Sequence, residues 1–109
     1  MFYFTLDENR HPQPCNDFNA YHDWHDSMPP SSDWYTMKTG LGFVVGLDEI
    51  GEERVSTVFL GINHAFGDEP PLLWETMVFP EADLHGRYST YEEAIEGHRQ
   101  AVESLKAVA

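Results

Sequence analysis

The chain has 109 residues, of which 41% are hydrophobic and 14% aromatic, and 19 acidic residues against 6 basic ones give it a formal charge of −13. This size is typical of one domain, and the supply of aromatic residues excludes an intrinsically disordered segment. We therefore expect a single acidic domain over residues 1–109. The acidity argues against nucleic acid and anionic membranes as direct partners, because both need a basic surface, and it favours basic proteins or cations.

The cysteine content and the hydropathy pattern bear on the compartment. Cys15 is the only cysteine of the chain, so an internal disulfide cannot form, and small secreted domains more often carry a cysteine framework. Residues 1–6 are too short a stretch for a signal peptide. No apolar run approaches the roughly 20 residues that span a bilayer. We expect a cytoplasmic protein with no membrane partner.

The first half of the chain predicts a strand, a short helix and further strands. Residues 1–6 are rich in aromatics and predict a strand, which a turn at residues 7–10 follows. Asn16 or Asp17 can then cap a short helix that ends near Ser27. The chain between residues 34 and 47 predicts one long strand or two, with bulges allowed by its glycines, which are Gly40, Gly42 and Gly46.

The middle of the chain carries its strongest β signal. Residues 48–53 predict a turn, and residues 55–62 are β-branched and aromatic almost throughout. After a loop rich in glycine and proline, residues 72–79 predict the matching strand. These two strands are adjacent in sequence, so we expect them to form an antiparallel pair.

The last element is predicted to be an amphipathic helix. A capping box occurs at residues 89–92 and again one residue later. The helix that follows repeats apolar positions on one face, which are Ala94, Ile95, His98, Ala101, Val102 and Leu105. Such a stripe needs a sheet or another helix to cover it. The sequence therefore predicts an α+β fold: an antiparallel sheet of about four strands, a C-terminal amphipathic helix packed on it and a short N-terminal helix.

One histidine cluster is a weak candidate for a metal site. On a helix, His22, His25 and Asp26 would share one face, and imidazole and carboxylate groups are ligands that transition metals accept. However, the two histidines lack the i, i+4 spacing of the zincin helix, and no glutamate lies between them. A solvated helix face explains the cluster equally well, so we expect neither a metal nor another cofactor.

Catalytic chemistry has little support in the sequence. His98 lies on the apolar stripe, where a buried histidine with a hydrogen-bond partner is expected. His64, Glu75 and His85 could approach one another as an acid–base pair, but no nucleophile or pocket accompanies them. The chain has no phosphate-binding loop and no nucleophile elbow, and Cys15 lies in no known motif. We expect that the protein is not an enzyme.

The distribution of acidic residues is the most informative feature. The charge of −13 exceeds the magnitude of roughly 2 to 8 that solubility requires of a small domain. Carboxylates a few ångströms apart could imitate the negative charge of DNA and occupy a basic groove that evolved for nucleic acid. The residues predicted to contact such a partner are Asp48, Glu49, Glu52, Glu53, Asp68, Glu69, Glu81 and Asp83.

The second half of the chain also resembles a known group of proteins. Residues 55–64, 74–79 and 87–94, followed by Gly97 and His98, resemble a family of small uncharacterised proteins that bacteriophages, prophages and mobile elements encode. The match covers about residues 54–102 and implies expression in a bacterial cytoplasm. It carries over no activity. Small acidic phage products often bind host machinery, as anti-CRISPR proteins do, so the resemblance implies a basic host protein or nucleoprotein, such as a Cas protein, as the partner.

Two alternative functions stay open at this point. The chain could bind a metal or a small molecule through its histidines and carboxylates, or serve as a phage assembly factor whose acidity only aids solubility. A homodimer is compatible with each function, because residues 1–6 could pair across two copies as exposed strands.

Overall fold

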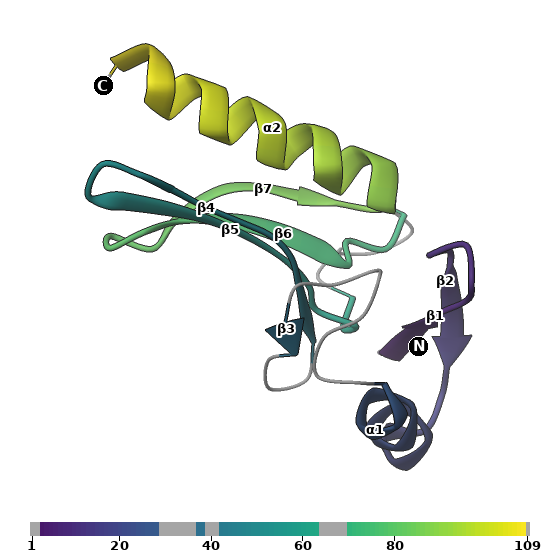
Figure 1. Ribbon diagram of the computed structural model, residues 1–109. Helices are drawn as coiled ribbons and strands as arrows, with labels where there is room; N and C mark the ends of the chain where they lie inside the picture. Colours follow the sequence, from purple (N-terminus) through teal and green to yellow (C-terminus); the bar gives the residue numbers. More distant parts are fainter. Residues whose placement is uncertain (1–2, 29–36, 39–41, 64–69, 109) are drawn as a thin grey trace.

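The fold is α+β and consists of a hairpin, a sheet and two helices (Figure 1). The computed structural model describes residues 3–28, 37–38, 42–63 and 70–108. Strands β1 and β2 form a separate hairpin, while β3 to β7 form one antiparallel sheet in chain order. The elements are β1 (Tyr3–Leu6), β2 (Pro12–Cys15), α1 (Phe18–Ser27), β3 (Met37–Lys38), β4 (Phe43–Ile50), β5 (Glu53–Phe59), β6 (Trp74–Phe79), β7 (Asp83–Tyr88) and α2 (Tyr91–Val108).

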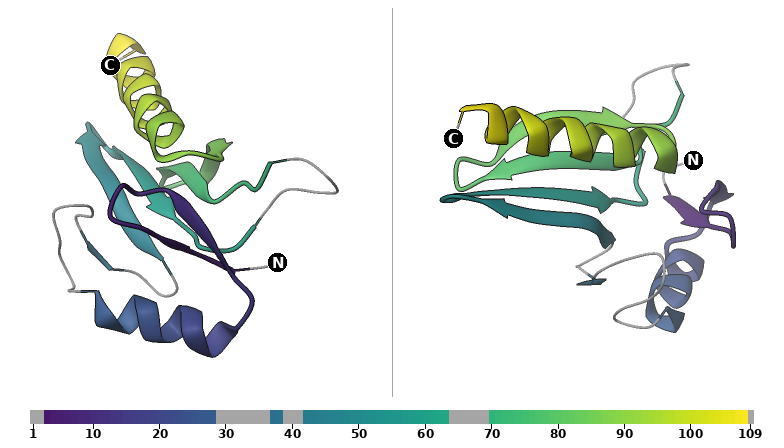
Figure 2. Two further views of the ribbon diagram at one scale, coloured as in Figure 1. Left: turned by 90° about the vertical axis from the view of Figure 1, so that its right-hand side faces the viewer. Right: turned by 45° about the horizontal axis from the view of Figure 1, so that its top comes forward.

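The elements leave the two ends of the sheet in different surroundings. Helix α2 lies along one face of the sheet, and α1 lies with the β1–β2 hairpin near one end of it (Figure 1, Figure 2). The turns that join β4 to β5 and β6 to β7 lie at the other end, and the C-terminus of α2 points towards that end. The sheet therefore has one end covered by other elements and one end that presents two turns.

The hydrophobic core lies at the covered end. Trp24 of α1 packs edge-on against Phe43 and Phe59, with ring centroids 5.4 and 6.2 Å apart. Phe59 also packs against Trp74, at 5.0 Å. The buried cluster consists of Phe4, Leu6, Phe43, Phe59, Leu73, Trp74 and Ala94. Burial of these large side chains, at roughly 1.5–3 kcal/mol each, holds the hairpin, the sheet and α2 together.

The alternation of buried side chains shows which face α2 covers. Val55, Thr57 and Phe59 are buried, whereas the residues between them are not. Because side chains alternate along a strand and paired residues point to the same side, these three positions and their partners on β4 and β6 face the helix. A bulge interrupts β4 between Val44 and Gly46, as the glycines of this segment predicted.

Both predicted helices are confirmed together with their caps. The Asp17 side chain accepts a hydrogen bond from the Asn19 amide at 2.9 Å and begins α1. At α2 the capping box forms at the second of the two predicted positions: the Glu93 amide donates to the Thr90 hydroxyl and the Thr90 amide to the Glu93 carboxylate, both at 3.1 Å. Neither helix, over its described residues, has the length and apolar character needed to cross a membrane.

The sheet of about four strands is confirmed as four long strands and the short β3, but its membership differs from the prediction in two places. Residues 3–6 form β1, which pairs with β2 instead of joining the sheet. It contacts the rest of the fold through a bridge from Tyr3 to Ile62 and through Phe4 and Leu6, which belong to the buried cluster. Strand β7 was not predicted, because its sequence contains aspartate, histidine, glycine and arginine rather than β-branched residues. Pairing with β6 outweighs that weak local preference.

The turn after β4 is shorter than predicted. Residues 48–50 belong to β4, and Ile50 pairs with Glu53, so only Gly51 and Glu52 make the turn. Gly51 has a φ of +63°, which glycine adopts without steric cost and which two-residue hairpin turns require. The acidic composition of the segment suggested a longer loop, but a glycine in the left-handed region lets the ladder continue to the tip.

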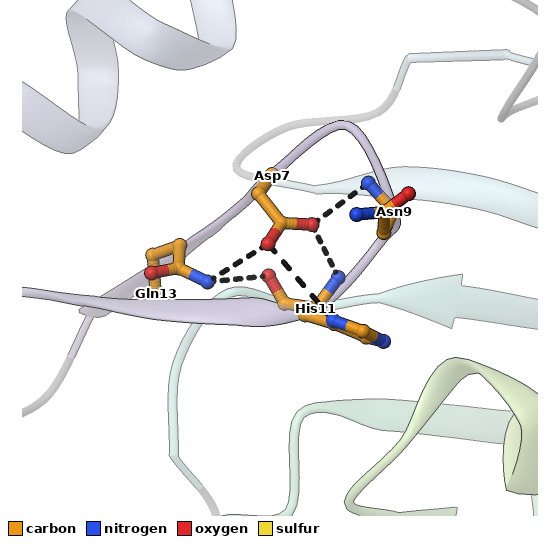
Figure 3. Close-up of polar contacts among 4 residues, drawn as sticks. All are labelled: Asp7, Asn9, His11 and Gln13. Carbon is orange, nitrogen blue, oxygen red and sulfur yellow. Dashed lines mark hydrogen bonds and ion pairs between the residues drawn. The ribbon is translucent and has the colours of Figure 1, made fainter.

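Asp7 organises the turn of the β1–β2 hairpin (Figure 3). Its carboxylate accepts hydrogen bonds from the amides of Asn9 and His11, at 2.8 and 3.0 Å, and from the Gln13 side chain at 3.2 Å. The bond from the His11 amide, followed by that from Asn9, lowers the pKa of Asp7 below its usual value of 3.8.

This lowered pKa predicts a loss of hairpin order in acid. A carboxylate with a depressed folded-state pKa stabilises the fold above its ordinary pKa, and that contribution is lost as pH falls through the lowered value. We expect the amide resonances of Asn9 and His11 to move together with the Asp7 carboxyl during an NMR titration below pH 3.8. Asp7→Ala should abolish that transition and raise hydrogen exchange in β1 at neutral pH. Glu8→Ala, in the same turn, serves as the control and should change neither; equal effects of the two substitutions would contradict the assignment.

Candidate functional site: the acidic end of the sheet

Carboxylates from two separate turns converge at the uncovered end of the sheet. Strand β5 pairs with both β4 and β6, and Arg54 near its start lies opposite Glu49 and Phe79. The β4–β5 and β6–β7 turns are therefore neighbours, although about 30 residues separate them in sequence. We call the carboxylates of these turns the acidic end; its members are Glu49, Glu52, Glu53, Glu81 and Asp83.

A hollow lies between the two turns. Its volume is about 400 Å³, and its walls include Glu49, Glu52 and Glu53 from the first turn and Phe79 and Pro80 from the second. Carboxylates beside an aromatic ring suit a guanidinium or ammonium group. Such a cation forms ion pairs with the carboxylates and a cation–π contact with the ring.

Arg54 already illustrates that chemistry within the chain. Its guanidinium lies 5.3 Å from the centroid of the Phe79 ring and forms part of the hollow wall. One positive charge against five carboxylates leaves the acidic end strongly negative. The C-terminus of α2, which points towards this end, adds the negative pole of its dipole.

The spacing of these charges follows from the sheet. Neighbouring strands lie ~4.8 Å apart and same-face residues along a strand ~6.8 Å apart, so carboxylates at their ends are held a few ångströms from one another. Duplex DNA carries one negative charge per ~1.7 Å of its axis, distributed over two strands. The carboxylates at the ends of these strands therefore form a local cluster of negative charge that a basic surface can bind, with a lower charge density than duplex DNA.

Asp48 lies apart from this group although the sequence placed it there. It is on the face that α2 covers, and its carboxylate accepts a hydrogen bond from His98 Nε2 at 2.6 Å. The other ring nitrogen of His98, Nδ1, lies 2.7 Å from the Thr57 hydroxyl, which lies 2.5 Å from the Thr76 hydroxyl. His98 is therefore largely rather than fully buried, at 12% side-chain exposure, and it has hydrogen-bond partners as predicted, namely Asp48 and Thr57.

The order hydroxyl, imidazole and carboxylate is also that of a catalytic triad, but access to solvent distinguishes the two arrangements. Thr57 and Thr76 are both 0% exposed, because they lie beneath α2 in the middle of the sheet. A nucleophile has to reach its substrate, and a hydroxyl in this position cannot. The chain of four side chains instead joins α2 to three residues of β4, β5 and β6.

The three weak candidates for a metal site, His22, His25 and Asp26, lie close together, but their polar atoms contact one another. Asp26 contacts both histidines, with one oxygen 3.2 Å from His22 Nδ1 and the other 3.5 Å from His25 Nδ1. His25 is buried against the Phe43 ring, whereas His22 is exposed. Within the described part of the chain, no group of three or more His, Cys, Asp or Glu side chains is arranged to hold a metal ion.

The predicted acid–base group is separated by the pairing of β6 with β7. Glu75 lies opposite Arg87 in the register and accepts a hydrogen bond from its Nε at 3.0 Å. His85 falls at the irregularity between these strands, so Glu75 is committed to arginine instead. His64 lies outside the described residues, as do Asp68 and Glu69 of the predicted binding set.

Comparison with models of protein families, with curated proteins and with solved structures gave no match. The resemblance to phage-encoded proteins therefore stays a prediction.

Three residues that line the hollow beside its carboxylates were not predicted from the sequence. Arg54, Phe79 and Pro80 line the hollow, but their proximity depends on strand register, which composition does not reveal. Thr57 and Thr76 had a usable signal, because both occupy inward positions of alternating strands, where a hydroxyl needs a partner.

Proposed function

We propose that this chain is an inhibitory binding protein whose acidic end occupies a basic nucleic-acid-binding site on another protein. The observation that carries the proposal is a hollow lined by three carboxylates, those of Glu49, Glu52 and Glu53, and by the Phe79 ring, with Glu81 and Asp83 on the neighbouring turn and strand. Lysine and arginine side chains that normally hold phosphates would pair with the carboxylates, and one of them would enter the hollow beside Phe79.

The position of the acidic end suits such contacts. Four of its five carboxylates are exposed and Glu53 is half-buried, so no rearrangement of the core is needed to reach them. A rigid β-hairpin tip also loses less conformational entropy on binding than a loose acidic tail. The charge of the whole chain adds long-range attraction, which raises the association rate with a basic partner at low salt.

The resemblance to phage-encoded proteins supports a particular setting for this activity. In a bacterial cytoplasm, the protein would act as an anti-CRISPR or other anti-defence protein, and its partner would be a Cas protein or another basic nucleoprotein. Binding there would exclude guide RNA or target DNA by competition for the same positive charges.

The test compares two variants of equal net charge. Glu49→Gln/Glu52→Gln/Glu53→Gln removes three carboxylates of the acidic end, and Glu8→Gln/Asp23→Asn/Glu92→Gln removes three exposed carboxylates elsewhere. The tagged chain is first used to isolate a partner from nuclease-treated bacterial lysate that contains an active CRISPR–Cas system. Affinity for the purified partner is then measured with each variant, together with competition by DNA.

We expect the acidic-end variant to bind roughly 10- to 100-fold more weakly, at about 0.5–1 kcal/mol for each lost exposed ion pair. The control variant should bind nearly as the original chain does. Affinity of the original chain should fall as salt rises, because exposed charge pairs are screened. Equal losses in the two variants would show that total charge rather than the acidic end determines binding, and a partner that DNA does not displace would exclude occupation of a nucleic-acid site.

A further inference from the structure

The face of the sheet opposite α2 carries an exposed apolar row. Pairing places Leu47 opposite Ser56, Ser56 opposite Met77, and Met77 opposite Leu84, so one line of side chains crosses four strands. We call these four residues the outer row. Leu47 is 41% exposed and Leu84 is 51% exposed, while Ser56 and Met77 between them are half-buried.

This composition departs from that of a solvated sheet face. An antiparallel sheet with one covered face normally presents polar side chains on the other. Here the outer row has leucine at both ends and methionine inside it, and Phe79 and Val58 lie in the adjacent rows on the same face. Three of the four residues of the outer row are apolar and Ser56 is polar, and together with Phe79 and Val58 they form an apolar surface of the kind that another molecule covers.

The charges on this face cancel, in contrast with the rest of the molecule. Glu49 lies opposite Arg54 on one side of the outer row, and Glu75 is ion-paired with Arg87 on the other side at 3.0 Å. These two acids and two bases sum to zero, although the chain as a whole has a formal charge of −13. Two copies of so acidic a protein repel one another through most of their surfaces, but not through this face.

We propose that two copies of the chain pair face to face through the outer row and form a β-sandwich with α2 on each outside. Two sheets stack in this way ~10 Å apart, with interdigitating apolar side chains. A two-fold axis along the outer row sets each leucine against its counterpart in the other copy. It also directs the two acidic ends to opposite ends of the pair, which reduces their mutual repulsion. Glu49 then lies within the contact, while Glu52 at the turn stays outside it.

The same axis sets the two flanking rows of charges against each other. It sets the row that contains Glu49 and Arg54 above the row that contains Glu75 and Arg87 of the other copy. Because each strand lies over its own counterpart, Arg54 on β5 comes near Glu75 on β6 of the other copy, whereas Glu49 on β4 and Arg87 on β7 stay three strands apart. The axis therefore brings one pair of opposite charges together on each side of the outer row, which a uniformly acidic face could not do. A basic protein would instead be attracted to the acidic end, so a second copy fits this face better than such a partner does.

The experiment is sedimentation velocity of the full chain from low micromolar to several hundred micromolar concentration. We expect a monomer–dimer equilibrium in which Leu47→Gln/Leu84→Gln raises the dissociation constant about tenfold or more, because each lost leucine contact counts twice in a symmetric pair. Ile95→Gln on α2 is the matched control, since Ile95 is also 41% exposed but lies on the other side of the sheet. Circular dichroism verifies that both variants are folded.

Salt separates this proposal from the proposed function. Added salt should strengthen the dimer, because it screens repulsion between two copies, whereas it should weaken binding of a basic partner to the acidic end. A chain that stays monomeric over the whole concentration range at high salt would overturn the dimer. Dimerisation of the glutamine double variant with unchanged affinity would overturn the assignment to the outer row. Neither result bears on binding at the acidic end.

Discussion

Gly61→Ala should lower the free energy of unfolding by roughly 2–5 kcal/mol, the sum of a backbone and a packing effect. Gly61 has a φ of +73°, a conformation that costs an L-residue about 1–2 kcal/mol. In addition, a Cβ at this position would lie 2.2 Å from the hydroxyl and 2.6 Å from the ring of Tyr21, which is fully buried. Displacing a ring from a closely packed site adds the cost of overpacking, about 1–3 kcal/mol.

Gly61 is also the position where the N-terminal elements meet the sheet. Its carbonyl accepts a hydrogen bond from the Phe4 amide at 2.8 Å, and the Tyr21 hydroxyl donates to the adjacent Leu60 carbonyl at 3.5 Å. A shift of Tyr21 therefore loosens both α1 and the β1–β2 hairpin. We expect the loss of protection from hydrogen exchange to be greatest in these elements and smallest at the β4–β5 turn.

Gly51→Ala is the matched control for the backbone contribution. Gly51 has a similar φ of +63°, but a Cβ there would meet nothing within 4 Å. Urea denaturation of both variants should give a loss of about 1–2 kcal/mol for Gly51→Ala and a clearly larger one for Gly61→Ala. If the two losses are equal, the packing of Tyr21 on Gly61 contributes nothing to stability.

Local patterns in the sequence predicted most of the fold because its elements have strong local signals. Asp17 and Thr90 occupy capping positions, and both begin helices in the structure. The β-branched segment that contains Val55 forms a central strand, as predicted. Strand β7 lacked such a signal, since its stability comes from pairing with β6 and from α2 above it.

The site was harder to predict because it depends on register. The sequence predicted Glu49, Glu52, Glu53, Glu81 and Asp83 as contact residues, and in the structure they form two clusters, one at each turn. That the two clusters are neighbours follows from the pairing of Arg54 with Phe79, which no local pattern encodes. Asp48 was grouped with its acidic neighbours, but alternation along β4 turns it to the opposite face, where His98 binds it.

The contrast between the two faces at this end connects the two proposals. Exposed carboxylates gather around the turns, while the outer row is uncharged and the charges in the rows beside it sum to zero. A dimer formed through the outer row would carry two acidic ends that face away from each other. Because Glu49 and Phe79 lie in the row beside the outer row, such a dimer would engage basic sites through the carboxylates at the turns rather than through the hollow. It could bind two such sites at once, with a gain in apparent affinity that depends on the distance between them.

Thr57→Val should lower the free energy of unfolding by about 1–3 kcal/mol, more than Thr76→Val does, although both residues are fully buried. The Thr57 hydroxyl lies between two hydrogen-bond partners, 2.7 Å from His98 Nδ1 and 2.5 Å from the Thr76 hydroxyl. Since Asp48 accepts a hydrogen bond from His98 Nε2, Nδ1 depends on Thr57 for its partner. Removal of the Thr57 hydroxyl takes a hydrogen bond from both His98 Nδ1 and the Thr76 hydroxyl, whereas removal of the Thr76 hydroxyl breaks the one bond to Thr57.

The double variant Thr57→Val/Thr76→Val tests whether the two hydroxyls stabilise the fold as a hydrogen-bonded pair or each contributes independently. Once Thr57 is valine, the Thr76 hydroxyl is a buried group deprived of its bond to Thr57, so replacing it as well should cost nothing more and can recover stability. We expect the double variant to be no less stable in urea denaturation than Thr57→Val alone, which amounts to a coupling energy of about 1 kcal/mol between the two sites. Additive losses would mean that the two hydroxyls act independently. In that case α2 is held on the sheet by apolar packing, and the bonds from His98 to Thr57 and Asp48 add little to its position.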